Sequence, residues 1–250
     1  MPGRRGPSGA SCKLIGHRTG LDHRAHQERK SARGPDGLQT GRRVPRVNFE
    51  ARQSTMDTEL ADVLSRHPVP RHRLTVLEYR RLGEAGVLGE ADRVELLDGQ
   101  LVDMSPIGVR HALAVDALTE LLVTAVAGRA GVRVQNPVEL DDSTEVHPDI
   151  ALVRRPWQGY PAAHPRPIDI ILLVEVADTS LETDRGAKLE LYARAGVREF
   201  WIVDLTTDGV LVYRNPHSSR YGVMSRVERS GVLEVQDLPG VAIPAASLFV

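Results

Sequence analysis

A carboxylate inside an apolar run is the most informative chemical feature of this 250-residue sequence. Glu175 interrupts residues 170–176, which are otherwise Ile, Leu and Val. Such a run predicts a strand buried on both faces, where a lone carboxylate must find a cation or take up a proton. Glu175 is therefore a candidate metal ligand or catalytic acid. An ordinary ion pair with an arginine at the sheet edge is the alternative.

Asp149 could supply a second carboxylate to the same site. It follows Pro148 and opens the apolar segment 150–153, so it would stand at the rim of a sheet. If that strand neighbours the one carrying Glu175, the two acids suit a hard cation such as Mg²⁺. Taken alone, a Pro-Asp pair is more typical of an aspartate that satisfies the amides of a turn.

Lys188 is the exception in an arginine-rich composition. Residues 56–250 contain 19 Arg and this single Lys. On a helix expected from 184 to 195, Lys188 lies on the core-facing stripe with Tyr192, which could hold the ammonium or simply pack. A compact ammonium there could orient a water or stabilise a phosphoryl oxyanion. The alternative is a surface ion pair with Asp184, one turn earlier.

Glu95 and His111 complete the set of candidates. Glu95 lies in an apolar run before Asp98-Gly99, and is either a third carboxylate near the metal or an exposed hairpin residue. His111 starts a run of apolar residues at helical spacing and points inward. It is either catalytic or a satisfied core histidine.

The elements that must position these residues follow from local patterns. Thr75 and Glu78 form a capping box at a helix start, and Asp98-Gly99 between short apolar runs predicts a hairpin. The spacing predicts a helix over 111–128. Strands are expected at 132–140 (with an edge or bulge at Pro137), 148–153, 170–176, 200–203 and 210–213, with further strand and turn to the end. This order predicts a mixed α/β fold around one sheet.

Composition excludes several protein classes. The single cysteine, Cys12, excludes an internal disulfide framework and a zinc site with two or more cysteines. No stretch approaches 18 uninterrupted apolar residues, and no leader with a cleavage site is evident. We therefore expect a cytoplasmic protein without a membrane span.

The net charge of −1 averages two unlike segments. Residues 1–55 hold 12 Lys or Arg against 4 Asp or Glu, whereas residues 56–250 hold 20 against 29. The first segment is also rich in Gly and poor in aromatic residues, which predicts a basic disordered arm. A start at Met56 is an alternative. Residues 56–250 fit one domain.

The sequence resembles the PD-(D/E)XK nuclease superfamily, and within it the large bacterial branch of candidate restriction endonucleases. The resemblance runs from about residue 95 to 204, and the order and spacing of its fragments carry it. The matching fragments are Glu95-Leu96-Leu97-Asp98-Gly99, Met104-Ser105-Pro106, His111, Pro148-Asp149-Ile150, Val174-Glu175-Val176, Asp184 with Lys188 and Tyr192, Ala195-Gly196-Val197, and Glu199 through Asp204.

The resemblance implies a restriction-endonuclease-like fold, a mixed central sheet flanked by helices. It further implies Mg²⁺, with Mn²⁺ as an alternative, bound by Asp149 and Glu175 with help from Glu95. Lys188 would position the attacking water. The superfamily usually has a lysine two residues after the second acid, where this chain has Ala177, so the lysine has moved to the following helix.

The implied activity is hydrolysis of phosphodiester bonds in nucleic acid, with DNA favoured, by a homodimer. Replacing Asp149 or Lys188 by Ala is expected to abolish Mg²⁺-dependent nicking and to leave thermal stability nearly intact. The charge of −9 on residues 56–250 opposes this reading, because nucleic-acid binding relies on basic surface.

Functional classes other than a DNA nuclease also fit the sequence. They are another hydrolase or a nuclease acting on RNA or structured nucleic acid, and an inactive nuclease fold that serves as a binding or dimerisation module. A glycosidase is disfavoured, because few of the chain's ten aromatic residues lie near the acids.

Overall fold

The computed structural model describes residues 70–89, 92–155 and 163–249. These residues belong to a compact unit that runs from Pro68 to Val250. The predicted basic arm, residues 1–55, lies outside the described residues, as does the start of the predicted domain at residue 56. No helix in the described ranges is long and apolar enough to cross a membrane.

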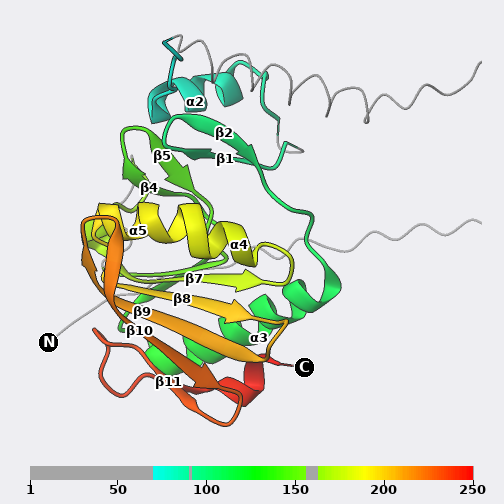
Figure 1. The fold of residues 1–250 in the computed structure, drawn as a ribbon, viewed down its shortest axis with the longest axis vertical. Coiled ribbons are helices and arrows are strands. Elements are labelled where there is room, and N and C mark those ends of the chain that lie inside the picture. Colours follow the sequence, from blue (N-terminus) through cyan, green and yellow to red (C-terminus); the bar gives the residue numbers. More distant parts are fainter. Residues whose placement is uncertain (1–69, 90–91, 156–162, 250) are drawn as a thin grey trace, which may run out of the picture. The chain divides into compact units, whose positions relative to one another are not determined.

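A six-stranded mixed sheet forms the centre of the domain (Figure 1). Its order is β10-β9-β8-β7-β6-β3, and only β7 and β8 run parallel. The strands are β3 (Gly131–Val134), β6 (Ile150–Val153), β7 (Ile170–Ala177), β8 (Glu199–Asp204), β9 (Gly209–His217) and β10 (Arg220–Glu228). All eight residues of β7 are buried, as its apolar run predicts. The predicted mixed α/β fold is confirmed.

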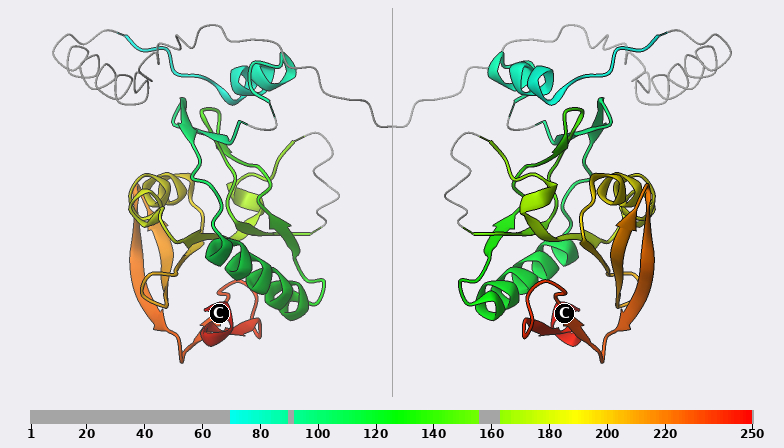
Figure 2. Two further views of the ribbon diagram at one scale, coloured as in Figure 1. Left: turned by 90° about the vertical axis from the view of Figure 1, so that its right-hand side faces the viewer. Right: turned by 90° about the vertical axis from the view of Figure 1, so that its left-hand side faces the viewer.

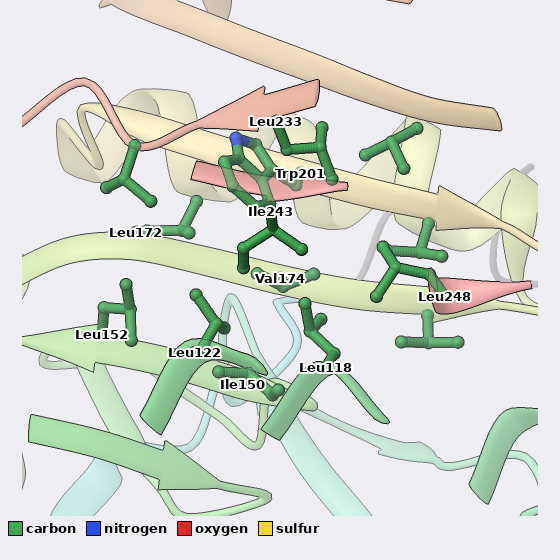
Figure 3. Close-up of a cluster of buried hydrophobic side chains, with 14 of the residues drawn as sticks. Leu118, Leu122, Ile150, Leu152, Leu172, Val174, Trp201, Leu233, Ile243 and Leu248 are labelled. Atoms are coloured by element: carbon green, nitrogen blue, oxygen red, sulfur yellow. The ribbon is translucent and has the colours of Figure 1, made fainter. Parts of the chain in front are cut away.

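Helices cover both faces of this sheet. The long helix α3 (Val109–Val126) packs on one face, and α5 (Leu189–Ala195) covers the other (Figures 1 and 2). Leu118 and Leu122 of α3 lie beside Ile150 of β6, in one buried cluster that also contains Trp201 of β8 (Figure 3). The ribbon β11 (Val232–Glu234) and β12 (Ala242–Pro244) and the 3-10 helix η4 (Ala245–Leu248) contribute to the same core.

The structure contains a second, smaller sheet, whereas the sequence predicted a single one. Its order is β2-β1-β5-β4, formed by β1 (Val94–Leu97), β2 (Gln100–Asp103), β4 (Val138–Asp141) and β5 (Thr144–Val146). The predicted Asp98-Gly99 hairpin joins β1 and β2, and both turn residues have positive φ (48° and 77°). The expected strand over 132–140 is two strands, β3 and β4, which separate around Pro137 into different sheets.

Helix α2 (Val76–Glu84) is tied to the small sheet by ion pairs. The predicted capping box at Thr75 and Glu78 is present. From α2, Arg80 contacts the buried Glu139 of β4 at 2.8 Å and Glu145 of β5 at 3.0 Å. Because these carboxylates are buried, the guanidinium must stay in place to balance their charge.

The crossover from β7 to β8 is irregular. The 3-10 helix η2 (Pro167–Asp169) precedes β7; after β7 follow α4 (Leu181–Thr183), the π-helical turn η3 (Asp184–Lys188) and α5. The helix expected from 184 therefore begins three residues earlier and contains a π segment. It ends at Gly196, in the left-handed region at φ 80°, as expected.

Candidate active site

Antiparallel pairing of β6 and β7 brings the two predicted acids together. Ile150 pairs with Val174. Continuing that register by one residue sets Asp149 opposite Glu175. The backbone N–H of Val176 donates to Oδ2 of Asp149 at 2.9 Å, which fixes the aspartate at the start of its strand. The predicted convergence of the two acids therefore has a simple cause in strand register.

Asp149 is held as a carboxylate by three hydrogen bonds. His111 Nε2 lies 2.9 Å from Oδ2, and Gln135 Nε2 donates to Oδ1 at 3.1 Å. Burial opposes ionisation, but the bonds from His111, Val176 N–H and Gln135 outweigh it and lower the pKa of Asp149. The bond to Asp149 in turn raises the pKa of His111 against the effect of burial. The contact between the imidazole and the carboxylate thus favours the charged form of each group.

Lys188 lies between two buried carboxylates. Its Nζ is 3.0 Å from Glu175 Oε1 and 3.2 Å from Glu95 Oε2. Burial disfavours the ammonium, yet the charges of Glu175, Glu95 and Asp184 outweigh burial and raise the pKa of Lys188. Lys188 is only 7% exposed, so the alternative of a surface ion pair with Asp184 is wrong.

Tyr192, one turn after Lys188, donates its hydroxyl proton to Glu175. The distance from the phenol oxygen to Oε1 is 2.6 Å, and the ring packs edge-on against Phe200. Burial raises the pKa of Tyr192 well above its ordinary value, with the charges of Glu175 and Glu95 adding to it, so the phenol stays a donor. Burial also raises the pKa of Glu175, and the Lys188 ammonium opposes that rise.

Glu95 enters the site from the small sheet. The backbone N–H of His147 donates to its Oε1 at 2.6 Å, and Lys188 is its second partner among the described residues. Glu95 is 3% exposed, so it is not the exposed hairpin residue that the sequence left as an alternative. The structure thus brings it to the lysine through β1 of a separate sheet.

Asp184 stands at the edge of the same cluster. Its Oδ2 accepts a hydrogen bond from the Ser180 hydroxyl at 2.6 Å. Burial raises the pKa of Asp184, and the nearby Lys188 charge counteracts this. Asp184 is a buried neighbour that adds negative potential around the ammonium.

A cavity of about 190 Å³ opens onto these groups. Six of the seven predicted residues line it, and Tyr192 lies behind Glu175. The predicted lining residues are Glu95, His111, Asp149, Glu175, Asp184 and Lys188. Residues far apart in the sequence therefore share one water-accessible space.

Sequence reasoning missed four polar residues that line this cavity or contact the residues lining it. Gln135 orients Asp149, His147 fixes Glu95 through its backbone, and Ser180 binds Asp184. Arg93 lines the cavity and forms no ion pair within the described ranges; its Nη1 donates to the Ser105 carbonyl at 3.1 Å. Only Ser180, four residues before Asp184, carried a local signal, that of a helix start.

The carboxylate oxygens of the site meet part of what a hard cation requires. Asp149 and Glu175 offer carboxylate oxygens on one cavity, and Oε2 of Glu175 receives no hydrogen bond from the described residues. With the side chains as they stand, no group of three or more His, Cys, Asp or Glu in the described part of the chain is arranged to hold a metal. Two protein carboxylates are nevertheless sufficient for Mg²⁺, which keeps several of its waters.

A mixed sheet flanked by helices, with two acids from paired strands and a lysine on the crossover helix, defines a restriction-endonuclease-like α/β protein. Residues 76–246 match the model of the Uma2 family, described as "Putative restriction endonuclease". The chain belongs to this family, which confirms the resemblance seen in the sequence.

A solved structure has the same fold. A protein from Anabaena variabilis ATCC 29413, titled as a "putative nuclease belonging to DUF820", superposes with a TM-score of 0.57 at 17% sequence identity. The match covers 70% of this chain and 97% of that one. Among curated proteins, none matches the sequence significantly.

Proposed function

We propose that this domain hydrolyses phosphodiester bonds in nucleic acid, with DNA as substrate and Mg²⁺ or Mn²⁺ as cofactor. The observation that carries the proposal is the contact of Lys188 with Glu175 at 3.0 Å, on the same cavity as Asp149. This is the set of groups that phosphoryl chemistry needs: two oxygen ligands for a cation and a fixed positive charge. The family description supports the same class of reaction.

Asp149 and Glu175 would hold the cation. When bound, it would supply Lewis-acid stabilisation of the phosphoryl charge and favour ionisation of the attacking water. The chain's own residues prepare the site. His111, Gln135 and the Val176 amide keep Asp149 ionised and oriented, while Tyr192 fixes the Oε1 side of Glu175.

Lys188 would place its charge beside the scissile phosphate. Its partner Glu95 is a candidate third metal ligand, but the 3.2 Å contact with Lys188 favours a positioning role. His111, bonded to Asp149, is likewise proposed to act through that carboxylate. Arg93 at the cavity would bind a neighbouring phosphate, since its guanidinium has no ion pair among the described residues.

The test compares isosteric variants in a cleavage assay. Glu175→Gln and Asp149→Asn should lower Mg²⁺-dependent nicking of supercoiled DNA by orders of magnitude, because each removes a ligand charge while keeping side-chain shape. Asp116→Asn, an exposed aspartate on α3, is the matched control and should cleave like the wild type. Wild-type rates in either site variant would overturn the proposal.

A non-catalytic binding module is the second candidate. It is favoured by the completeness of the network: both oxygens of Asp149 and the Lys188 ammonium already have partners within the protein. Calorimetric titration with Mg²⁺ and Mn²⁺ separates the two. A nuclease should bind metal in the wild type and lose it in Glu175→Gln. The binding module predicts no metal binding, and no cleavage of a panel of DNA and RNA substrates.

A further inference from the structure

The outer strand β10 presents a long unpaired edge. It has nine residues, of which seven are exposed, and it pairs only with β9 in the described part of the chain. The other outer strands of the two larger sheets, β2, β3 and β4, have four residues each. Figure 2 shows the β9–β10 hairpin (orange) along one side of the sheet. Long exposed edges invite pairing with another strand, and proteins usually shorten them or protect them with lysine or proline.

The sequence of β10 is complementary to itself in the antiparallel direction. If two copies pair with Met224 opposite Met224, Arg220 of one copy faces Glu228 of the other, twice per dimer. Arg220 is exposed and forms no ion pair within the described ranges. Glu228 is 65% exposed at its side chain, and among the described residues its side chain forms an ion pair only with Arg226, on its own strand. Opposite charges directly across two strands stabilise their pairing.

The centre of the same strand is apolar. Met224 is 57% exposed and Val223 is 44% exposed, and both lie between the charged residues Arg220 and Glu228 of the strand. In the Met224-centred register these residues meet at the middle, with the charged pairs at both ends. An apolar centre with a charged rim is the usual composition of a protein–protein interface.

We propose that the chain forms a homodimer in which β10 of two copies pairs antiparallel about a two-fold axis at Met224. The contact is isologous, so it closes at two copies, and it joins the two six-stranded sheets into one. No residue of β10 lines the candidate active site within the described structure, so the pairing leaves that cavity open. The proposal does not depend on the chain being a nuclease.

Charge reversal tests the register in solution. Sedimentation velocity of the full chain over a concentration series should show a dimer. Arg220→Glu or Glu228→Arg alone should weaken it about tenfold or more, since each variant places like charges across both ends. An equimolar mixture of the two variants should recover wild-type association, because every cross-strand pair is again of opposite charge. Arg185→Glu, an exposed change elsewhere, should have no effect.

Cross-linking tests the same register independently of charge. In a Cys12→Ser background, Met224→Cys should form an intermolecular disulfide under mild oxidation, because residue 224 lies opposite itself at a distance that a disulfide spans. Val223→Cys is the matched control and should not, since it faces residue 225. A monomer at all concentrations would overturn the proposal. A dimer whose affinity is changed by neither charge reversal would also overturn it, as would equal cross-linking at residues 223 and 224.

Discussion

The pKa values of the two acids in the cavity are shifted in opposite directions by their surroundings. Asp149 accepts hydrogen bonds from His111, Gln135 and a backbone amide, and these lower the pKa of its carboxyl despite burial. Glu175 has fewer donors and deeper burial, which raises its pKa well above the ordinary value. The surroundings of Asp149 thus favour its ionised form, and a bound cation would favour ionisation of the neighbouring Glu175. This combination suits metal binding.

At the residue scale, Lys188 should contribute to stability as well as to activity. Lys188→Ala removes the cation between Glu175 and Glu95, so we expect a loss of about 3–5 kcal/mol in the free energy of unfolding. This revises the expectation from the sequence that the substitution leaves stability nearly intact. The reason is burial on both sides of the ammonium, which no local pattern reveals. Urea denaturation measures the loss.

The double variant Glu175→Gln/Lys188→Ala separates charge from packing. It should lose less stability than Lys188→Ala alone, because only Glu95 is then left as a buried carboxylate without its cation. The control is Arg185→Ala, an exposed residue in the same π-helical turn, which should stay within about 0.5 kcal/mol of the wild type. Equal losses in the single and double variants would contradict the ion-pair explanation.

At the element scale, the crossover between β7 and β8 determines the site. Parallel strands require such a crossover, and here it carries Lys188 and Tyr192 back over Glu175. The turn from Asp184 to Lys188 is π-helical, a feature that is frequent at functional sites. The small sheet contributes Glu95 from the opposite direction.

The turn after β8 makes a pH-dependent contribution. Asp204 accepts from the Thr206 amide at 2.9 Å and from the hydroxyls of Thr206 and Thr207 at 2.6 Å each. Burial opposes its charge, but these bonds outweigh burial and lower the pKa of Asp204. Because the folded pKa lies below the unfolded one, the stabilisation is complete above the unfolded pKa. It is lost as pH falls through the folded pKa.

Asp204→Asn should therefore destabilise the protein by about 1–3 kcal/mol at pH 7. The difference from the wild type should begin to shrink below a pH of about 4, where this carboxyl takes up a proton in the unfolded chain, and it should vanish below the lowered pKa of the folded state. Thermal melts between pH 3 and 7 measure this. Asp208→Asn, in the same turn, replaces a residue in an exposed ion pair with Arg229 and should cost less than about 1 kcal/mol at any pH. A constant deficit for Asp204→Asn across the range would contradict the assignment.

At the scale of the whole molecule, charge limits how nucleic acid can bind. Residues 56–250 carry a formal −9, and many of their arginines already contact carboxylates. Within residues 56–250 this leaves fewer cations to displace counterions from a phosphate backbone, so this segment should add little to the salt dependence of binding. Arg93 is an exception near the site, because it lines the cavity without an ion pair in the described ranges.

Arg93→Ala should raise KM more than it lowers kcat and should reduce the salt slope of binding by about one. Fluorescence anisotropy of labelled DNA with the Glu175→Gln variant as background, between 50 and 200 mM salt, measures the slope without cleavage. Arg81→Ala, an exposed arginine on α2, is the control and should leave both quantities unchanged. An unchanged slope in Arg93→Ala would show that Arg93 does not contact phosphate.

Much of this molecule follows from local sequence alone. The capping box at Thr75, the hairpin at Asp98-Gly99 and the buried strand around Glu175 were all predictable, because each depends on residues adjacent in the chain. The unusual residue types also identified the candidate site: a carboxylate in an apolar run, and the single lysine among the arginines of residues 56–250. These signals arise from the cost of burying charge.

Tertiary structure decided what those residues contact. The division of residues 132–140 between two sheets, the π-helical turn and the contact of Glu95 with Lys188 all depend on pairings between distant segments. Gln135 shows the same limit, since nothing in its neighbours indicates that it binds Asp149. Strand register and helix crossover are global solutions to packing a core, so composition and periodicity locate the charged groups but not their partners.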